Sequence, residues 1–273
     1  MTRNELDAAI GELLLAGRVV CVHSSLRSFG TVEGGADAVI DAFLDSGCTL
    51  LVPSHSWGFA TNHLPGLRPP RNGWDYSMNV APPLFHGAFS TQSNAIDRNM
   101  GAIPRAVLAR PERQRGDHPL ASFSAIGPLA ADLVGGQDGD AVHAPLRALC
   151  EFDGAIVMVG VGLTRMTLLH LAEEMAGRTQ FQRWALDASG KTVMVSSGGC
   201  SEGFEQLAQV LAPIETRLGV GASTWRRFDA AAVITLASDE IDANPAITHC
   251  SQRSCRRCDD AAHGGPVLAE AAG

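Results

Sequence analysis

The sequence predicts an α/β protein whose central sheet is mixed but largely parallel. Three short, β-branched or continuously apolar runs, at residues 18–23, 49–52 and 155–160, indicate buried strands. Between the first two runs lies a segment with helical spacing of apolar residues. Strand, helix and strand in this order form a βαβ unit, which predicts parallel strands with helices on the faces of the sheet.

The first 53 residues contain the clearest pattern. Thr2 and Glu5 form a capping-box pattern, and apolar residues at helical spacing follow them, so we expect a helix that ends near Gly17. Residues 36–43 predict a second helix, and the strand at 49–52 closes at Pro53.

Residues 54–100 contain proline, glycine and asparagine without a convincing periodicity. Irregular segments of this length in compact domains are usually functional, so we expect a substrate loop with Trp57 as a candidate binding residue. The alternative is that the segment contains short strands that periodicity does not reveal.

The second half of the chain continues the alternation of helices and strands. Proline in the first turn supports a helix at 103–108, and Gly160 ends the strand at 155–160. The other expected elements are a helix at 164–176, a hairpin of strands 181–186 and 192–195, a helix at 204–211, a last strand at 230–236 and a terminal helix from Ser238 to about Asn244. We expect one domain over residues 1–260 and a frayed tail at 261–273.

Composition excludes several classes of protein. The chain is 45% hydrophobic and 18% charged, which is typical of a globular protein, and its formal net charge is -8. An acidic chain is a poor nucleic-acid binder but is compatible with a cationic small molecule; it can also simply be soluble. Without a run of about 18 apolar residues or a basic, apolar leader, we expect no membrane span and a cytoplasmic location.

The seven cysteines are odd in number and dispersed, which does not match a secreted disulfide framework. The C-terminal group His249, Cys250, Cys255, Cys258 and His263 leaves two alternatives open, a zinc site or free cytosolic thiols. We expect no metal ligand in the active site and no metal requirement.

Ligands of open α/β sheets bind outside the carboxyl ends of the strands, and three motifs fall at such positions. In the first motif, Ser24, Ser25, Leu26 and Arg27 follow the first strand. Backbone N–H groups and hydroxyls at a strand-to-helix turn suit phosphate oxygens, and Arg27 adds a positive charge. A serine-rich turn without a ligand is the alternative.

The second motif joins His118, Pro119 and Ser122 in one loop. Proline stiffens the loop, and His118 can bind, catalyse or satisfy a turn carbonyl. In the third motif, Thr167, His170 and Glu173 share one face of the expected helix at 164–176. A carboxylate beside an imidazole orients the ring and stabilises its charged form, as a general base requires, although a surface pair has the same spacing.

The ordered set of motifs resembles the aminoglycoside 3-N-acetyltransferase family over about residues 1–260. The matching segments are 23–26, 34–36, 52–55, 100–104, 118–123 and 160–173. The chain departs from the family pattern at Arg105, Gly116 and Met166, and residues 85–100 fit poorly.

The resemblance implies a three-layer α/β/α sandwich, distinct from the general N-acetyltransferase fold. It implies acetyl-CoA as donor and an aminoglycoside amine as acceptor, with His170 as base supported by Glu173. It also implies coenzyme A contacts from Ser24, Ser25, Leu26, Arg27, His118 and Ser122. Thr167 or a backbone N–H is expected to stabilise the oxyanion.

An aminoglycoside is a polycation, so we expect carboxylates at the acceptor site. The candidates by sequence position are Asp138, Asp140, Glu202 and Glu205. Direct transfer to the amine is expected, because no cysteine has an evident base partner in the sequence. Two other functions stay open: acetyl transfer to a different, biosynthetic amine, and coenzyme A or small-molecule binding without catalysis. The sequence leaves the oligomeric state, monomer or dimer, open.

Overall fold

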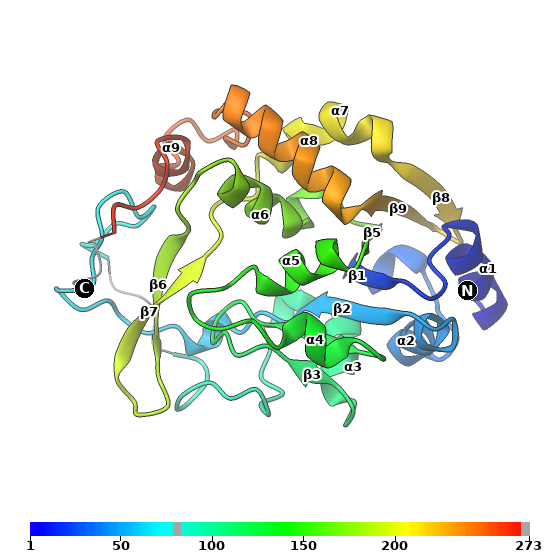
Figure 1. Cartoon of the computed structure of the whole chain (residues 1–273). Coiled ribbons are helices and arrows are strands. Elements are labelled where there is room, and N and C mark those ends of the chain that lie inside the picture. The colour runs from blue at the N-terminus through cyan, green and yellow to red at the C-terminus, as the bar shows by residue number, and fades with distance from the viewer. Residues whose placement is uncertain (79–82, 269–273) are drawn as a thin grey trace.

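The computed structural model describes residues 1–78 and 83–268, and its centre is a seven-stranded mixed sheet (Figure 1). The strand order is β3-β4-β2-β1-β5-β9-β8. The strands are β1 (Val19–Ser24), β2 (Thr49–Pro53), β3 (Gln114–Arg115), β4 (Phe123–Ile126), β5 (Ala155–Val159), β8 (Thr216–Val220) and β9 (Ser223–Asp229).

The sheet is parallel only at its centre. Strand β1 pairs in parallel with β2 and β5, as the βαβ pattern predicts. The pairings β2–β4, β3–β4, β5–β9 and β8–β9 are antiparallel. The sheet is therefore mixed, as expected, but its flanks are antiparallel and parallel pairing does not dominate. A short connection suffices between antiparallel strands such as β8 and β9, where a parallel pair needs a crossover element.

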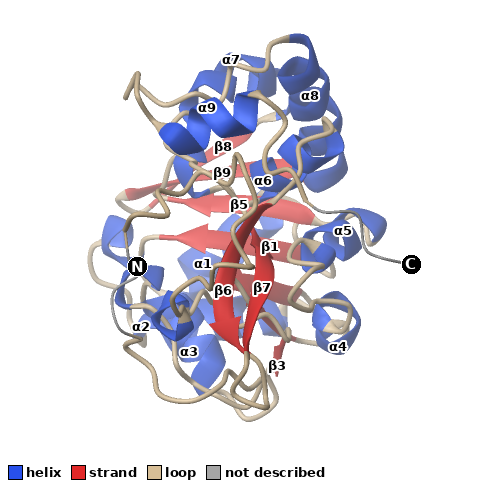
Figure 2. Ribbon diagram, turned by 90° about the vertical axis from the view of Figure 1, so that its left-hand side faces the viewer, coloured by secondary structure: helices blue, strands red, loops and turns tan. Residues whose placement is uncertain are grey.

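Helices cover both faces of the sheet, which makes the three layers (Figure 2). One face packs on α1 (Arg3–Glu12), α2 (Gly35–Asp45) and α3 (Ala102–Ala109). The other face packs on α4 (Ala130–Val134), α5 (Ala144–Glu151), α6 (Leu168–Met175), α7 (Ala208–Leu211) and α8 (Ala230–Ala243). Each strand contributes side chains to both cores, because successive strand residues point to opposite faces of the sheet. Val20 and Val22 enter one core, and Cys21 enters the other.

A separate antiparallel hairpin, β6 (Phe181–Leu186) and β7 (Thr192–Ser197), confirms the expected hairpin. It extends beyond the end to which β2 points (Figure 1). In the described part of residues 54–100, Ala60 pairs with Ala185 of β6 in an isolated bridge, and the regular structure consists of two 3-10 turns, Trp57–Phe59 and Arg98–Met100. The expected long loop is therefore present and contacts the hairpin.

The expected strand at 230–236 is wrong, because these residues begin helix α8. Val233, Ala237 and Ile241 are buried at intervals of four residues, which is the spacing of one helix face. Alanine is the strongest helix former, and it outweighs the β-branched residues in this run. The last strand is β9, and the helix expected from Ser238 is the second half of α8.

The C-terminal segment contains α9 (Arg256–Ala262). Two backbone hydrogen bonds attach the residues that follow it: Thr179 N–H donates to Gly264 O, and Val267 N–H donates to Pro70 O. The described part of the expected frayed tail is thus tied to the body of the protein, and residues 269–273 lie outside the described residues. Within the described ranges, no helix is long and apolar enough to span a bilayer.

Candidate active site

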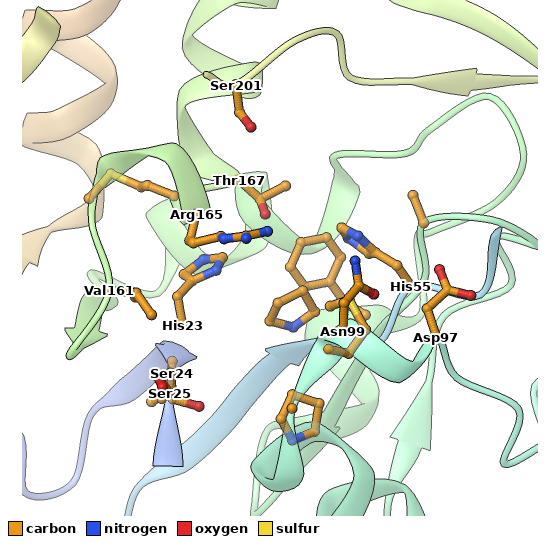
Figure 3. A pocket seen from close by; sticks show the side chains of 18 of the residues that line it. His23, Ser24, Ser25, His55, Asp97, Asn99, Val161, Arg165, Thr167 and Ser201 are labelled. Atoms are coloured by element: carbon orange, nitrogen blue, oxygen red, sulfur yellow. The ribbon is translucent and has the colours of Figure 1, made fainter. Parts of the chain in front are cut away.

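A cavity of about 1310 Å³ opens where β1, β2 and β5 end, the edge at which the sequence predicts ligand binding. Its wall includes His23, Ser24, Pro53 and Gly160 from the ends of these strands. Figure 3 shows His23 and Arg165 on one side of this space, with His55 and Asn99 on another. The cavity is therefore built from segments that are distant in the sequence.

His170 lines this cavity from helix α6. Its Nδ1 lies 2.7 Å from Glu173 Oε2, and both side chains are buried. A carboxylate accepts the proton on Nδ1, which leaves the lone pair on Nε2. Among the described residues, Nε2 has no hydrogen-bond partner. The expected histidine–carboxylate pair is thus formed, with one ring nitrogen left free to act.

Glu173 does not line the cavity; it lies behind His170 in a buried network. Its other oxygen, Oε1, accepts hydrogen bonds from Arg178 Nη1 and from Thr248 Oγ1, the latter at 3.2 Å. Arg178 also donates to Thr248 Oγ1 (2.8 Å) and to Pro245 O (2.6 Å). These bonds hold the carboxylate in one position, so that it orients the imidazole.

Thr167 lines the cavity, but it lies one residue before the helix. Helix α6 begins at Leu168, and residues 163–165 form a separate 3-10 turn, so the expected continuous helix from residue 164 is wrong. The carbonyl of Thr167 accepts from His170 N–H at 3.0 Å. Thr167 therefore stays beside His170, at the helix N-terminus.

The residues after β1 form one wall of the cavity. Ser24, Ser25, Leu26 and Arg27 all line it. Ser25 N–H donates to Val159 O at 2.9 Å, which ties the turn to the end of β5. A 3-10 turn, Leu26–Phe29, follows directly. The first motif therefore forms part of the cavity wall.

The cavity wall is strongly cationic. Five described arginines line it: Arg27, Arg98, Arg105, Arg165 and Arg257. Only one acidic residue, Asp97, is among the described lining residues. Arginine forms strong, charge-assisted hydrogen bonds with phosphate groups, so this wall suits an anionic ligand.

His118 and Ser122 are fully buried and do not line the cavity. His118 Nδ1 accepts from Leu120 and Ala121 N–H groups, so its Nε2 donates to Ser196 O at 2.8 Å. Ser122 Oγ accepts from Arg115 Nε at 3.0 Å and donates to Ser54 O. Of the roles open to His118, the structure supports the structural one: it ties its loop to β7.

The four carboxylates expected at the acceptor site are also absent from the cavity wall that the structure describes: Asp138, Asp140, Glu202 and Glu205. Asp138 caps a turn by accepting from the Asp140 and Ala141 N–H groups, which lowers its pKa. Glu205 accepts from Leu163 N–H and so supports the 3-10 turn before α6. Sequence position alone did not distinguish these local roles from a ligand contact.

Trp57 and Asp97 bring the expected substrate loop to the cavity. Asp97 Oδ2 accepts from Trp57 N–H at 2.9 Å, and Oδ1 accepts from Gly58 N–H at 3.3 Å. Burial raises the pKa of Asp97. Asp97 was not predicted from the sequence, because no motif marks it in the irregular loop.

Three further histidines, His23, His55 and His143, line the cavity. His23 and His55 fall in segments that match the family pattern, although no role was expected for them, and no motif marked His143. Burial lowers the pKa of His23 to about 4 and that of His55 to about 3, so both rings are neutral at physiological pH. His55 Nε2 is buried and has no hydrogen-bond partner in the described structure. The ring of His143 stacks parallel to that of His170 with centroids 6.5 Å apart.

Cys21 has a histidine neighbour, which the sequence did not indicate: its Sγ lies 3.7 Å from His23 Nε2. The thiol is fully buried, and burial raises its pKa. A protonated thiol is a poor nucleophile. Cys21 does not line the cavity, so this pair is not an activated cysteine.

The model of the family described as aminoglycoside 3-N-acetyltransferase matches residues 21–241. Aminoglycoside N(3)-acetyltransferase IX of Micromonospora chalcea is 34% identical over 185 residues, which cover 64% of this chain and 63% of that protein. The chain thus spans less than two thirds of that relative's length.

The chain belongs to the aminoglycoside 3-N-acetyltransferase family. The crystal structure of aminoglycoside acetyltransferase AAC(3)-IVa, apoenzyme, shares its fold with a TM-score of 0.75 and 24% identity, covering 96% of this chain and 97% of that one. A structure described as AAC-IIIb binary with CoASH has a TM-score of 0.71 and 24% identity, covering 89% and 97%. The expected α/β fold is confirmed.

Two departures from the pattern of the aminoglycoside 3-N-acetyltransferase family have structural explanations. A Cβ atom at Gly116 would lie 2.0 Å from Oε1 of Gln137, and this oxygen accepts from Phe123 N–H. Glycine is therefore required while Gln137 holds this position. Arg105 lies in the cavity wall, where it adds to the positive charge.

Proposed function

We propose that this protein transfers an acetyl group from acetyl-CoA to an amine of an aminoglycoside, with His170 as general base. The observation that carries the proposal is the His170 imidazole in the cavity wall, with Nδ1 bonded to Glu173 and Nε2 without a partner. A base of this kind must hold an open lone pair at the reacting centre. Family membership supports the reaction class.

In the proposed reaction, the amine nitrogen attacks the carbonyl carbon of the thioester. His170 Nε2 takes a proton from that nitrogen, and the carbonyl electrons move onto oxygen. The oxyanion then collapses, the carbon–sulfur bond breaks and the coenzyme A thiolate leaves, taking up a proton from His170. Glu173 supports this cycle because its carboxylate stabilises the imidazolium that forms between the two proton transfers.

Thr167 is the proposed oxyanion donor. It lines the cavity directly before helix α6, and its carbonyl bonds to the backbone of His170. A hydroxyl aimed at the developing charge stabilises the transition state more than the ground state.

The wall formed by Ser24, Ser25, Leu26 and Arg27 is the proposed coenzyme A site. Its backbone groups and hydroxyls can bond phosphate oxygens, and the neighbouring arginines match the phosphate charges. The fold relative with CoASH supports this ligand class. His118 and Ser122 contribute by holding the loops behind the wall.

The positions of the cysteines support direct transfer, without an acyl-enzyme, because an acyl-enzyme needs a reactive nucleophile in the cavity. None of the described lining residues is a cysteine, and the Cys21 thiol beside His23 is buried and protonated. The amine therefore attacks the thioester itself, with both substrates bound together.

The acceptor is proposed to bind near Trp57 and Asp97. A second acceptor class, an amine with few positive charges, has one specific observation in its favour: Asp97 is the only carboxylate among the described lining residues, against five arginines. A polycation favours several carboxylates, whereas a compact amine needs one.

The test is release of free thiol from acetyl-CoA in the presence of aminoglycosides and, separately, monoamines of similar size. Thiol release with an aminoglycoside that disappears in His170→Ala supports the proposal. Faster release with monoamines moves the assignment to the second acceptor class. Binding of coenzyme A without thiol release for any amine would reject catalysis and favour a binding protein.

A further inference from the structure

Four cysteines that the acetyl-transfer reaction does not use converge outside the cavity. The Sγ atoms of Cys200, Cys250, Cys255 and Cys258 all lie within 4.8 Å of one another. Three of the residues are buried and Cys250 is half-buried, and together they form a small cluster of their own. They come from two segments that are about 50 residues apart, the loop after β7 and the region around α9.

Local structure directs the thiols of the second segment to one point. Cys255 is the N-cap residue of α9 and Cys258 lies in the first turn, so a Cys-x-x-Cys spacing places both side chains on the same side. Cys250 N–H points at Cys258 Sγ, with a nitrogen–sulfur distance of 3.4 Å. Cys200 completes the set from the loop that follows Thr192–Ser197.

We propose that these four cysteines bind one structural Zn²⁺ ion. A tetrahedral Zn(Cys)₄ site with zinc–sulfur bonds of about 2.3 Å places its sulfurs about 3.8 Å apart, a small contraction from the present cluster. Four thiolates fill the coordination sphere and leave no open position, so the ion is structural and takes no part in acetyl transfer. On binding, four thiol protons pass to solvent and no atom is oxidised.

The histidines of the sequence pattern are not ligands of this site. His249 Nδ1 lies 2.8 Å from Cys250 O and its Nε2 lies 3.0 Å from Asp259 Oδ1. His263 Nδ1 bonds to Asp259 O at 2.7 Å. Cys200, which the C-terminal pattern could not include, takes the fourth position instead.

The zinc ion would join two segments, one of which contacts the His170 ring and the other its partner Glu173. The loop that contains Cys200 passes His170 at Gly198, where a Cβ atom would lie 2.6 Å from His170 Cδ2. The segment that contains Cys250 includes Thr248, which donates to Glu173. Zinc therefore stabilises the surroundings of the base and its carboxylate without touching either.

The experiment measures zinc directly in the whole chain, independently of acetyl transfer. We expect about one zinc per chain by elemental analysis of protein purified without added metal. X-ray absorption should show four sulfur ligands, and replacement by Co²⁺ should produce the visible bands of a tetrahedral thiolate site.

Cys255→Ser and Cys258→Ser should lose zinc, whereas Cys150→Ser, a half-buried thiol on α5, should retain it. If a ligand variant fails to fold, removal of zinc from the native protein by a chelator should still lower its Tm, and added zinc should restore it. Protein that contains no zinc and binds none on reconstitution would overturn the proposal, as would two disulfides among these cysteines. A zinc site in a protein inactive on every amine would leave this inference standing while rejecting the proposed function.

Discussion

At the scale of single residues, the proposed chemistry depends on the different partners of the two nitrogens of His170. Nδ1 bonds to Glu173, which in turn is held by Arg178 and Thr248. Nε2 has no partner in the described structure and belongs to the cavity wall. An imidazole held in this way is preorganised to take a proton, because neither the ring nor its carboxylate must move.

His170→Ala should reduce kcat by roughly 10²–10⁴-fold, because the proton of the amine loses its acceptor. Steady-state thiol release with saturating acetyl-CoA measures this loss. Coenzyme A binding should change little, and Tm should fall modestly, because the variant removes a buried ring that packs against Phe204. His86→Ala removes an exposed imidazole and is the control. A turnover number equal to that of the unchanged protein would remove His170 from its role.

Arg27→Ala should raise the KM for acetyl-CoA by roughly 10-fold with a smaller effect on kcat, because one charge-assisted contact to phosphate is lost. Initial rates over a range of acetyl-CoA concentrations separate the two parameters. Lys191→Ala, which removes an equal charge from the hairpin outside the cavity, should leave KM unchanged. An unchanged KM in Arg27→Ala would place the coenzyme elsewhere.

At the scale of secondary-structure elements, the site depends on how closely the end of β7 passes helix α6. Gly198 follows Ser197, the last residue of β7, and lies against the ring of His170. The ring also contacts Phe204, with centroids 4.8 Å apart. Because the ring is packed against both the backbone at Gly198 and this aromatic side chain, a side chain at position 198 would force the ring to move.

Gly198→Ala should lower kcat by roughly 10–100-fold, because the new Cβ would lie 2.6 Å from His170 Cδ2 and push the ring out of position. The same kinetic assay measures this change, together with Tm to separate it from unfolding. Gly11→Ala is the matched control, since a Cβ atom there meets nothing within 4 Å. Undiminished turnover in Gly198→Ala would show that the ring position is not critical.

At the scale of the whole molecule, buried neutral histidines connect stability to pH. Burial lowers the pKa of His118 to about 4, and its two nitrogens bond to backbone groups of two segments. Because the unfolded chain binds a proton near pH 6.5 and the folded chain does so only near pH 4, acid favours unfolding. The contribution of neutral His118 to the free energy of unfolding is complete above pH 6.5 and is lost as the pH falls toward 4.

The free energy of unfolding should therefore decrease between pH 6.5 and pH 4, with His118 contributing roughly 3 kcal/mol of the change. Denaturant titrations at a series of pH values measure the slope. His118→Asn, which retains a hydrogen-bond acceptor but does not titrate, should show a shallower slope than the unchanged protein. The exposed-site variant His86→Asn should keep the full slope. Equal slopes for His118→Asn and the unchanged protein would contradict the argument.

Much of the first half of the fold was predictable because its signals are local. The capping box at Thr2 and the β-branched runs of β1 and β2 need no tertiary information. The short strands β3 and β4 and the short helices α4 and α5 were not predicted, since elements of two to eight residues contain too few positions for a periodic pattern. The helix α8 was mistaken for a strand because β-branched residues interrupt its alanines.

The sequence by itself determined the fold class, the family, and the proximity of His170 to Glu173, because residues three apart on a helix are neighbours whatever surrounds them. Only the tertiary structure decided that Arg178 and Thr248 hold Glu173, that His118 and Ser122 lie behind the cavity, and that Cys200 joins the C-terminal cysteines. These contacts link residues far apart along the chain, and local spacing contains no information about which distant segments pack together.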